Sequence, residues 1–548
     1  MSLFVYAFDN LNLKYGENCA VEHVSTTCPS IDLFFALVRD LSEDRLNELV
    51  DNCLKTNDKT VLTDLLVLIF QTRNCRGGKG EKKLAYLLIN KLFTAFPKTI
   101  SNLMELIPTY GYFKDLINIY ELPNITSELK EVTVRIFAKK LLEDKETLDK
   151  NKESKTFNIS LAGKWAPRVD KYFNDFARDL CSTMFPNDPK CHEKYRKLVV
   201  SLTKALEIPE VYMCANKYAE INFKRVSSLC LQRFRKAFMN ELLDTPPNEN
   251  QKETGNRFPD LQDRVNCRFN LQAALNEGKI NGKMLMPHEL TTKIGMVKSD
   301  MELQVFEEQW KKIREDVVNM CNSGTIEPNG LNLSKLLPLV DVSGSMSGTP
   351  MEVAIALGIL VSEVNHPQFR DRFITFDTNP SWIDLSKAKT LKEKVEITRK
   401  ASWGVTTDFM KAQELILQIV RDNKLPKEEV PDLIVFSDMQ FNAADKSYDT
   451  HYQLLVKKYK QLGSNYEPPR IVFWNLRGST SGVPVSANTS NTQMLSGFSP
   501  SMLKLVLSGK EIVNEDNKQI TPYQTFRLAI DDEMYDLVRQ VIQNSSEV

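Results

Sequence analysis

The chain of 548 residues shows two different spacings of apolar residues, which divide it near residue 330. In the first part, apolar positions recur every three or four residues, the spacing that places them on one face of a helix. Strand-like alternation is scarce there. The pattern predicts a mainly α-helical module of paired helices packed like an α-solenoid, although no clean repeat period is present. The helical segments expected are 31–38, 61–70, 84–93, 116–120, 132–142 and 198–206.

The second part begins with a continuous apolar run over residues 336–340. Such a run is typical of a strand that is covered on both faces, as in a parallel sheet. Apolar positions at helical spacing follow over 351–364, then a strand-like run over 372–377 and a second buried run over 432–438. This β-α-β order predicts a C-terminal α/β domain with a mostly parallel, Rossmann-type sheet.

Oxygen-bearing side chains follow the first of these strands. Asp341, Ser343 and Ser345 lie where the strand ends, and ligands of open α/β sheets bind at the carboxyl ends of strands. Their oxygens suit Mg²⁺ or Mn²⁺, and a site with few charged ligands leaves such an ion open to an outside carboxylate. The stretch 403–408 and Asp438, which ends the second buried run, can complete the same site. A simple turn rich in Ser and Gly is the alternative.

At these residues the sequence resembles the von Willebrand factor A domain and its metal-ion-dependent adhesion site. The resemblance implies that Ser343, Ser345 and Thr407 lie near the metal. It places Asp341 and Asp438 in either the inner or the second coordination shell. In that family the threonine precedes its helix by a short fixed spacing, which favours Thr407 and leaves Thr406 possible. The family often has a glycine after the last aspartate, where this chain has Met439.

A glycine-rich basic stretch, residues 73–83, stands out in the helical part. Glycines let backbone N–H groups crowd around an anion, and Arg73, Arg76 and Lys79 add positive charge, so we expect phosphate contacts there. The spacing is not that of a P-loop. The alternative is a turn between helices in which the lysines are a solvated face.

A second basic stretch, residues 195–240, holds nine Lys or Arg against three acids. Because the net charge of the whole chain is zero, any nucleic acid must bind at such a local patch. Four aromatic residues interleave with the charges; they either stack on bases or anchor a core, and the core is favoured. The RNA contacts expected here are Lys224, Arg225, Arg233, Arg235 and Lys236.

Further segments carry a second resemblance, namely 73–84, 106–116, 161–167, 286–290, 471–477 and 495–499. They are similar to an uncharacterised family of eukaryotes and large DNA viruses that joins a helical module to an A-like domain. More distantly, this order of modules is similar to the TROVE module of Ro ribonucleoproteins, a ring of helical repeats that binds structured RNA. We therefore expect a TROVE-like module over 1–330 and an A-like domain over 331–548, with 323–330 as the linker.

Enzymatic motifs are scarce. The chain has no H-E-x-x-H, G-x-S-x-G or kinase motif set, and its five histidines are scattered. His288 is expected to start or pack a helix rather than to transfer protons. The sequence thus favours a non-enzymatic scaffold that binds RNA or ribonucleoprotein and holds a cation for an acidic ligand. A metal-dependent protein-interaction scaffold without RNA is the alternative, and a metal-dependent nuclease is less favoured.

Composition bears on location. The longest apolar runs are far shorter than a membrane span, and the first residues lack the basic and apolar regions of a signal peptide. The ten cysteines form no C-x-x-C pair, which favours free thiols in a reducing compartment. We expect an intracellular protein, in the cytoplasm, without a membrane partner.

Overall fold

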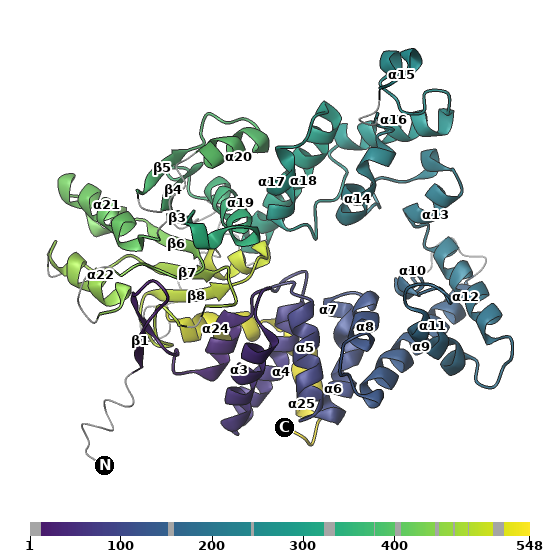
Figure 1. Cartoon of the computed structure of the whole chain (residues 1–548), viewed down its shortest axis with the longest axis horizontal. Helices are drawn as coiled ribbons and strands as arrows, with labels where there is room; N and C mark the ends of the chain where they lie inside the picture. Colours follow the sequence, from purple (N-terminus) through teal and green to yellow (C-terminus); the bar gives the residue numbers. More distant parts are fainter. Residues whose placement is uncertain are drawn as a thin grey trace. The chain divides into compact units, whose positions relative to one another are not determined.

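The computed structural model describes residues 12–151, 158–242, 246–322, 335–376, 379–400, 407–443, 449–463, 466–480, 482–507 and 520–548 (Figure 1). The chain forms two compact units. The first, called the sheet unit, consists of Met1–Leu84, Met286–Met296 and Ile313–Arg539. The second, called the helical unit, consists of Ala85–Leu285, Val297–Lys312 and Gln540–Val548.

A mixed six-stranded sheet lies at the centre of the sheet unit, in the order β5-β4-β3-β6-β7-β8. Neighbouring strands are parallel except β5, which runs antiparallel to β4 at one edge. The central strand β3 is buried along its whole length, as its apolar run predicts. The strands are β3 (Leu336–Asp341), β4 (Arg372–Phe376), β5 (Ser381–Asp384), β6 (Asp432–Ser437), β7 (Ile471–Asn475) and β8 (Thr492–Ser496).

Helices cover both faces of this sheet. Leu337 and Leu339 of β3 pack in one core with α21 (Phe409–Asp422) and α22 (His451–Lys460). Val340 points the other way, as alternation along a strand requires, and meets α19 (Thr349–Val364). A Cβ at Gly358 would lie 2.5 Å from Val340 Cγ2, so glycine allows this close approach. The unit also contains α17 (Pro287–Ile294), α20 (Leu391–Lys400), α23 (Lys504–Leu507) and α24 (Pro522–Ile530).

The N-terminal segment packs against the end of the chain within the sheet unit. Ser496 Oγ of β8 donates to Phe34 O at 2.9 Å, and Asn475 Nδ2 of β7 donates to Phe35 O at 3.2 Å. Arg527 of α24 binds the buried carboxylate of Asp64 with both contacts at 2.8 Å. The segment comprises β1 (Leu13–Tyr15), β2 (Val21–His23), α2 (Pro29–Ala36), α3 (Glu43–Lys55) and α4 (Lys59–Arg73).

The described residues of the helical unit include two groups of packed apolar side chains. In the first, the Phe137 ring meets those of Phe113 and Phe176 edge to face, and Tyr120 donates to Asp179 at 2.7 Å. The second joins α14 to α16. The helices are α5 (Lys83–Phe93), α6 (Pro97–Leu103), α7 (Ile107–Tyr110), α8 (Phe113–Tyr120), α9 (Ser127–Lys150), α10 (Ala162–Trp165), α11 (Asn174–Met184), α12 (Cys191–Ala205), α13 (Pro209–Cys214), α14 (Ser228–Phe238), α15 (Glu249–Thr254) and α16 (Gln262–Asn276). The boundaries between the units fall at the start of α5, on either side of Met286–Met296, and within α18 (Asp300–Asn322) and α25 (Asp536–Gln543).

The structure confirms a multidomain chain that is mainly helical with a sheet in its C-terminal part. Its compact units do not follow the sequence division at residue 330, because residues up to 84 and 286–296 belong to the sheet unit. The expected linker 323–330 lies outside the described residues. Among the described helices, none combines the length and apolarity needed to cross a bilayer.

Candidate functional site

The predicted cation-binding residues gather at the carboxyl ends of β3 and β6. Asp341, the last residue of β3, is fully buried, and its Oδ1 accepts the backbone N–H of Ser343 at 3.0 Å. Its Oδ2 accepts the hydroxyl of Ser437 from β6. Ser343 is buried and its Oγ lies 3.1 Å from Ser345 Oγ. Three of the five predicted residues therefore form one hydrogen-bonded group.

Asp438 brings a second buried carboxylate to this edge. Its Oδ1 accepts the backbone N–H of Gln440 at 3.1 Å, whereas its buried Oδ2 has no hydrogen-bond partner. Arg477 Nη1 lies 3.6 Å from that Oδ2, a distance at which charge attraction remains. Burial, and next the charge of Asp438, raise the pKa of Asp341 well above its ordinary value. The two carboxylates are thus close enough to repel each other.

Thr407 is buried, and its carbonyl accepts the backbone N–H of Asn442 at 2.9 Å, which ties it to the segment after β6. Asp408 follows and caps α21 by accepting the N–H of Lys411 at 3.0 Å. The alternative ligand Thr406 lies outside the described residues, so the choice between the two threonines stays a prediction.

The donor atoms fit a hard divalent cation. A buried carboxylate oxygen without a hydrogen bond, a second buried carboxylate and neutral serine hydroxyls are oxygen ligands of the kind that Mg²⁺ and Mn²⁺ prefer. Within the described part of the chain, no three His, Cys, Asp or Glu side chains form a metal-binding group. A cation here would therefore depend on the hydroxyls of Ser343, Ser345 and Thr407 as well as on the two aspartates.

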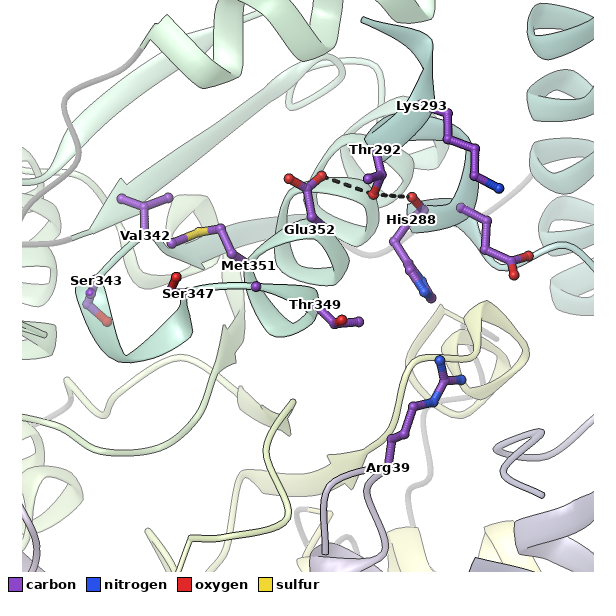
Figure 2. A pocket seen from close by; sticks show the side chains of 13 residues that line it. Arg39, His288, Thr292, Lys293, Val342, Ser343, Ser347, Thr349, Met351 and Glu352 are labelled. Carbon is purple, nitrogen blue, oxygen red and sulfur yellow. Dashed lines mark hydrogen bonds between the residues drawn. The ribbon is translucent and has the colours of Figure 1, made fainter. Parts of the chain in front are cut away.

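A cavity of about 720 Å³ opens beside this loop, and all its lining residues belong to the sheet unit. Figure 2 shows Ser343 and Ser347 at one end of it, and Gly344 also lines it. Figure 2 shows the side chains of Arg39, from the segment after α2, and of His288, from α17, on the other side of the cavity. The remaining lining residues are Glu289, Thr292, Lys293, Val342, Gly348, Thr349, Met351 and Glu352.

Two of the three cations that we expect to contact phosphate in the glycine-rich stretch are buried. Arg73 and Lys79 have no exposed surface. Lys79 Nζ donates to the carbonyls of Phe34 and Leu37 and to Ser496 Oγ, within the sheet unit. Arg76 is exposed, whereas the other two cations of the predicted phosphate site are not. Neither Arg73 nor Lys79 therefore presents its charge to solvent, and the phosphate contact stays a prediction for Arg76. Lys82 and Lys83 are exposed, as the alternative of a turn between helices with solvated lysines expects.

The second basic stretch lies in the helical unit, and several of its charges are already paired. Lys224 lies 3.4 Å from Glu277, Arg225 2.8 Å from Glu207, and Arg235 2.5 Å from Glu302. Arg233 and Lys236 are exposed on α14.

The aromatic residues of that stretch serve the core. Phe223 and Phe238 are buried in it, and Tyr218 and Phe234 pack against it. The interpretation favoured from the sequence, that these rings anchor a core rather than stack on bases, is confirmed.

Comparisons with known proteins find matches to both parts of the chain. Residues 336–539 match a family model described as a domain of unknown function, DUF7788, and residues 16–131 and 126–245 match another, DUF2828. The chain is 30% identical over 521 residues to "Uncharacterized protein L728" of Acanthamoeba polyphaga mimivirus, covering 91% of this chain and 85% of that protein. The chain belongs to the family of this mimivirus protein. No solved structure matches the chain.

The family relationship confirms the resemblance to proteins of large DNA viruses. The DUF7788 match spans all five candidate cation ligands, from Asp341 to Asp438, and the DUF2828 matches span both basic stretches. Two contributors to the cavity could not be found from the sequence. Arg39 and His288 are separated by some 250 positions along the chain, and only the fold brings them to one cavity.

Proposed function

We propose that the sheet unit contains a von Willebrand factor A-like domain that holds Mg²⁺ or Mn²⁺ and presents it to a carboxylate of a partner protein. The observation that carries the proposal is the pair of buried carboxylates, Asp341 and Asp438, beside the hydroxyls of Ser343 and Ser345. The strand order, 3-2-1-4-5-6 in chain order, supports it, since this is the Rossmann-type order that such a domain needs.

The charges of Asp341 and Asp438 favour a bound cation at the candidate site. Burial and the nearby charge of Asp438 destabilise the charged form of Asp341, as the raised pKa of Asp341 indicates. A divalent cation reverses this effect because it attracts both charges. Serine and threonine hydroxyls add oxygen ligands without adding charge, so the ion keeps enough positive charge to bind a further carboxylate.

The proposed role is binding rather than catalysis. Hydrolysis at a metal ion needs a general base placed to activate a water molecule. His288 is the histidine that lines the neighbouring cavity, and its pKa, lowered to about 4 chiefly by burial, makes it a weak base. A nuclease is therefore the less favoured function.

Thermal unfolding of the full-length chain with and without millimolar MgCl₂ or MnCl₂ tests the proposal. We expect either metal to raise the melting temperature, because an ion that binds the folded chain stabilises it by mass action. Asp341→Ala should abolish the shift and Asp438→Ala should reduce it. A wild-type chain whose melting temperature does not respond to metal would contradict the proposal.

Binding of structured RNA by the helical unit is a second candidate, supported by the exposed cations Arg233 and Lys236 of α14 and by Lys224. If all three contact phosphates, replacing them together by Ala should flatten the dependence of log affinity on log salt by roughly two to three units, at about 0.7 to 0.9 per contact. Filter binding of a hairpin RNA over a range of salt concentrations measures this slope. No RNA binding at low salt would eliminate the candidate.

A further inference from the structure

The cavity beside the cation loop contains an arginine held in a fixed orientation. Arg39 Nε and Nη2 donate to the buried carboxylate of Glu81 at 3.2 and 3.3 Å. Its guanidinium also lies over the ring of Phe498, 4.9 Å from the centroid. These contacts fix the plane of the guanidinium and leave the N–H groups of Nη1 for a ligand, and nearly half of the side chain is exposed.

His288 adds an unpartnered polar group to the same cavity. The side chain is 8% exposed, its ring meets Phe498 edge to face at 5.6 Å, and its buried Nδ1 has no hydrogen-bond partner. Figure 2 shows the imidazole pointing away from α17 and into the cavity, towards Arg39. Burial, and then the charges of Arg39 and Lys293, lower its pKa to about 4. The neutral ring therefore has one nitrogen available for a ligand.

The two acids of the cavity are already engaged by the protein. Glu352 accepts from Arg399 Nη2 at 2.7 Å and from Thr292 Oγ1 at 3.2 Å. Glu289 accepts the backbone N–H of Met286 at 3.1 Å, which caps α17. The exposed Lys293, one helical turn along α17 from Glu289, supplies a second positive charge. The cavity wall therefore offers the N–H groups of Arg39 Nη1 to an anion, and Lys293 adds a positive charge.

We propose that this cavity binds a second carboxylate of the partner's acidic segment. One carboxylate of that segment completes the cation beside Ser343, and another binds the N–H groups of Arg39 Nη1. Lys293 adds positive charge to the cavity wall. His288 Nδ1 accepts an N–H group of the segment. This inference rests on the proposed function. A volume of about 720 Å³ admits a few side chains but not a folded domain, so the ligand is a short exposed segment with at least two acidic residues.

Fluorescence anisotropy of labelled peptides on the full-length chain in MnCl₂ tests the inference. One probe is a hexaglutamate peptide, and the other has a single glutamate among glycines and serines. We expect hexaglutamate to bind more tightly. Arg39→Lys should weaken its binding roughly tenfold, the effect of losing a charge-assisted hydrogen bond, and Lys293→Gln should weaken it roughly twofold to fivefold through the lost positive charge. Neither variant should change Mn²⁺ affinity. Lys460→Gln, an exposed lysine of α22 outside the cavity, is the matched control.

The possible outcomes separate a failure of the second carboxylate site from a failure of the cation site. Equal binding of both peptides, or tight hexaglutamate binding by both cavity variants, overturns the second subsite while the cation site stands. Loss of binding by Lys460→Gln as well shows nonspecific attraction and also overturns it. If the wild type binds no Mn²⁺, the proposed function fails first. Should Arg39→Lys lower the melting temperature, the exposed Lys293→Gln decides alone.

Discussion

Met439, directly after Asp438, departs from the pattern of the proposed A-like domain in its side chain but not in its backbone conformation. Its φ of 63° lies in the left-handed region that favours glycine, the residue that A domains often have at this point. The side chain is 3% exposed and belongs to the core that joins the sheet to α21. At this position the backbone conformation therefore favours glycine, whereas the buried side chain favours methionine.

We predict that Met439→Gly destabilises the chain. Glycine relieves about 1 kcal/mol of backbone strain, but removing a buried methionine side chain costs about 2 to 5 kcal/mol. The net loss should be about 1 to 4 kcal/mol in the free energy of unfolding, measured by urea denaturation. A variant as stable as the wild type would show that the side chain contributes little to this core.

A pH effect should come from His288. Its pKa of about 4 in the folded chain lies below the ordinary value of 6.5, so the unfolded chain binds more protons between these values and stability falls as pH decreases through that window. The loss should be about 2 kcal/mol between about pH 7 and about pH 5.

His288→Gln should remove this part of the pH dependence, as measured by thermal unfolding at the two pH values. The comparison with the variant is needed because Asp64, whose pKa burial raises to about 6, changes stability in the opposite direction. An identical pH dependence in the variant and the wild type would contradict the assignment to His288.

At the scale of elements, the turn between α4 and α5 braces the fold. Lys79 is completely buried, its ammonium lies 4.3 Å from the centre of the Phe34 ring, and it donates to two carbonyls at the end of α2. Burial lowers its pKa well below the ordinary value. A glycine-rich basic turn has the same sequence whether its lysine faces solvent or the interior, so the sequence could not decide between these alternatives.

Lys79→Ala should destabilise the chain by about 1 to 3 kcal/mol, because two buried carbonyls and Ser496 lose a hydrogen-bond donor. Lys83→Ala, at the exposed start of α5, is the control and should change stability by less than about 0.5 kcal/mol. Urea denaturation of both variants measures the difference. Equal stability of the two variants would mean that the buried lysine is replaceable.

The elements that position the cation loop could be predicted from the sequence. A continuous apolar run gave β3, helical spacing gave α19, and a second run ending in Asp438 gave β6. The edge strand β5 and the order in which the strands pair could not be predicted. The spacing of apolar residues indicates how exposed an element is, but not which element lies next to it. The cavity could not be predicted from the sequence either, because Arg39 and His288, which line it, come from distant parts of the chain.

At the scale of the molecule, the N-terminal segment and the sheet form one unit. Residues up to Leu84 contact β7, β8 and α24, whose positions along the chain are some 400 residues later. Their hydrogen bonds and the Asp64–Arg527 ion pair close this unit. Nothing in the local sequence of α2 or α4 specifies so distant a partner.

We therefore predict that a fragment of residues 331–548 does not fold as an independent domain. It lacks the segment that contacts β8, and it leaves Arg527 without its buried carboxylate partner. The fragment should lose near-ultraviolet circular dichroism and melt without cooperativity, whereas the full-length chain should melt cooperatively. A fragment that melts within a few degrees of the intact chain would contradict the unity of the sheet unit.

The central claim is that Asp341, Ser343, Ser345, Thr407 and Asp438 hold a divalent cation. Electron paramagnetic resonance of Mn²⁺ titrated into the full-length chain measures it directly, because bound Mn²⁺ loses the sharp signal of the free ion. We predict one tightly bound Mn²⁺ per wild-type chain, displaced by excess Mg²⁺, and none in Asp341→Ala. An undiminished free-ion signal with the wild type, or equal binding by Asp341→Ala, would contradict the account.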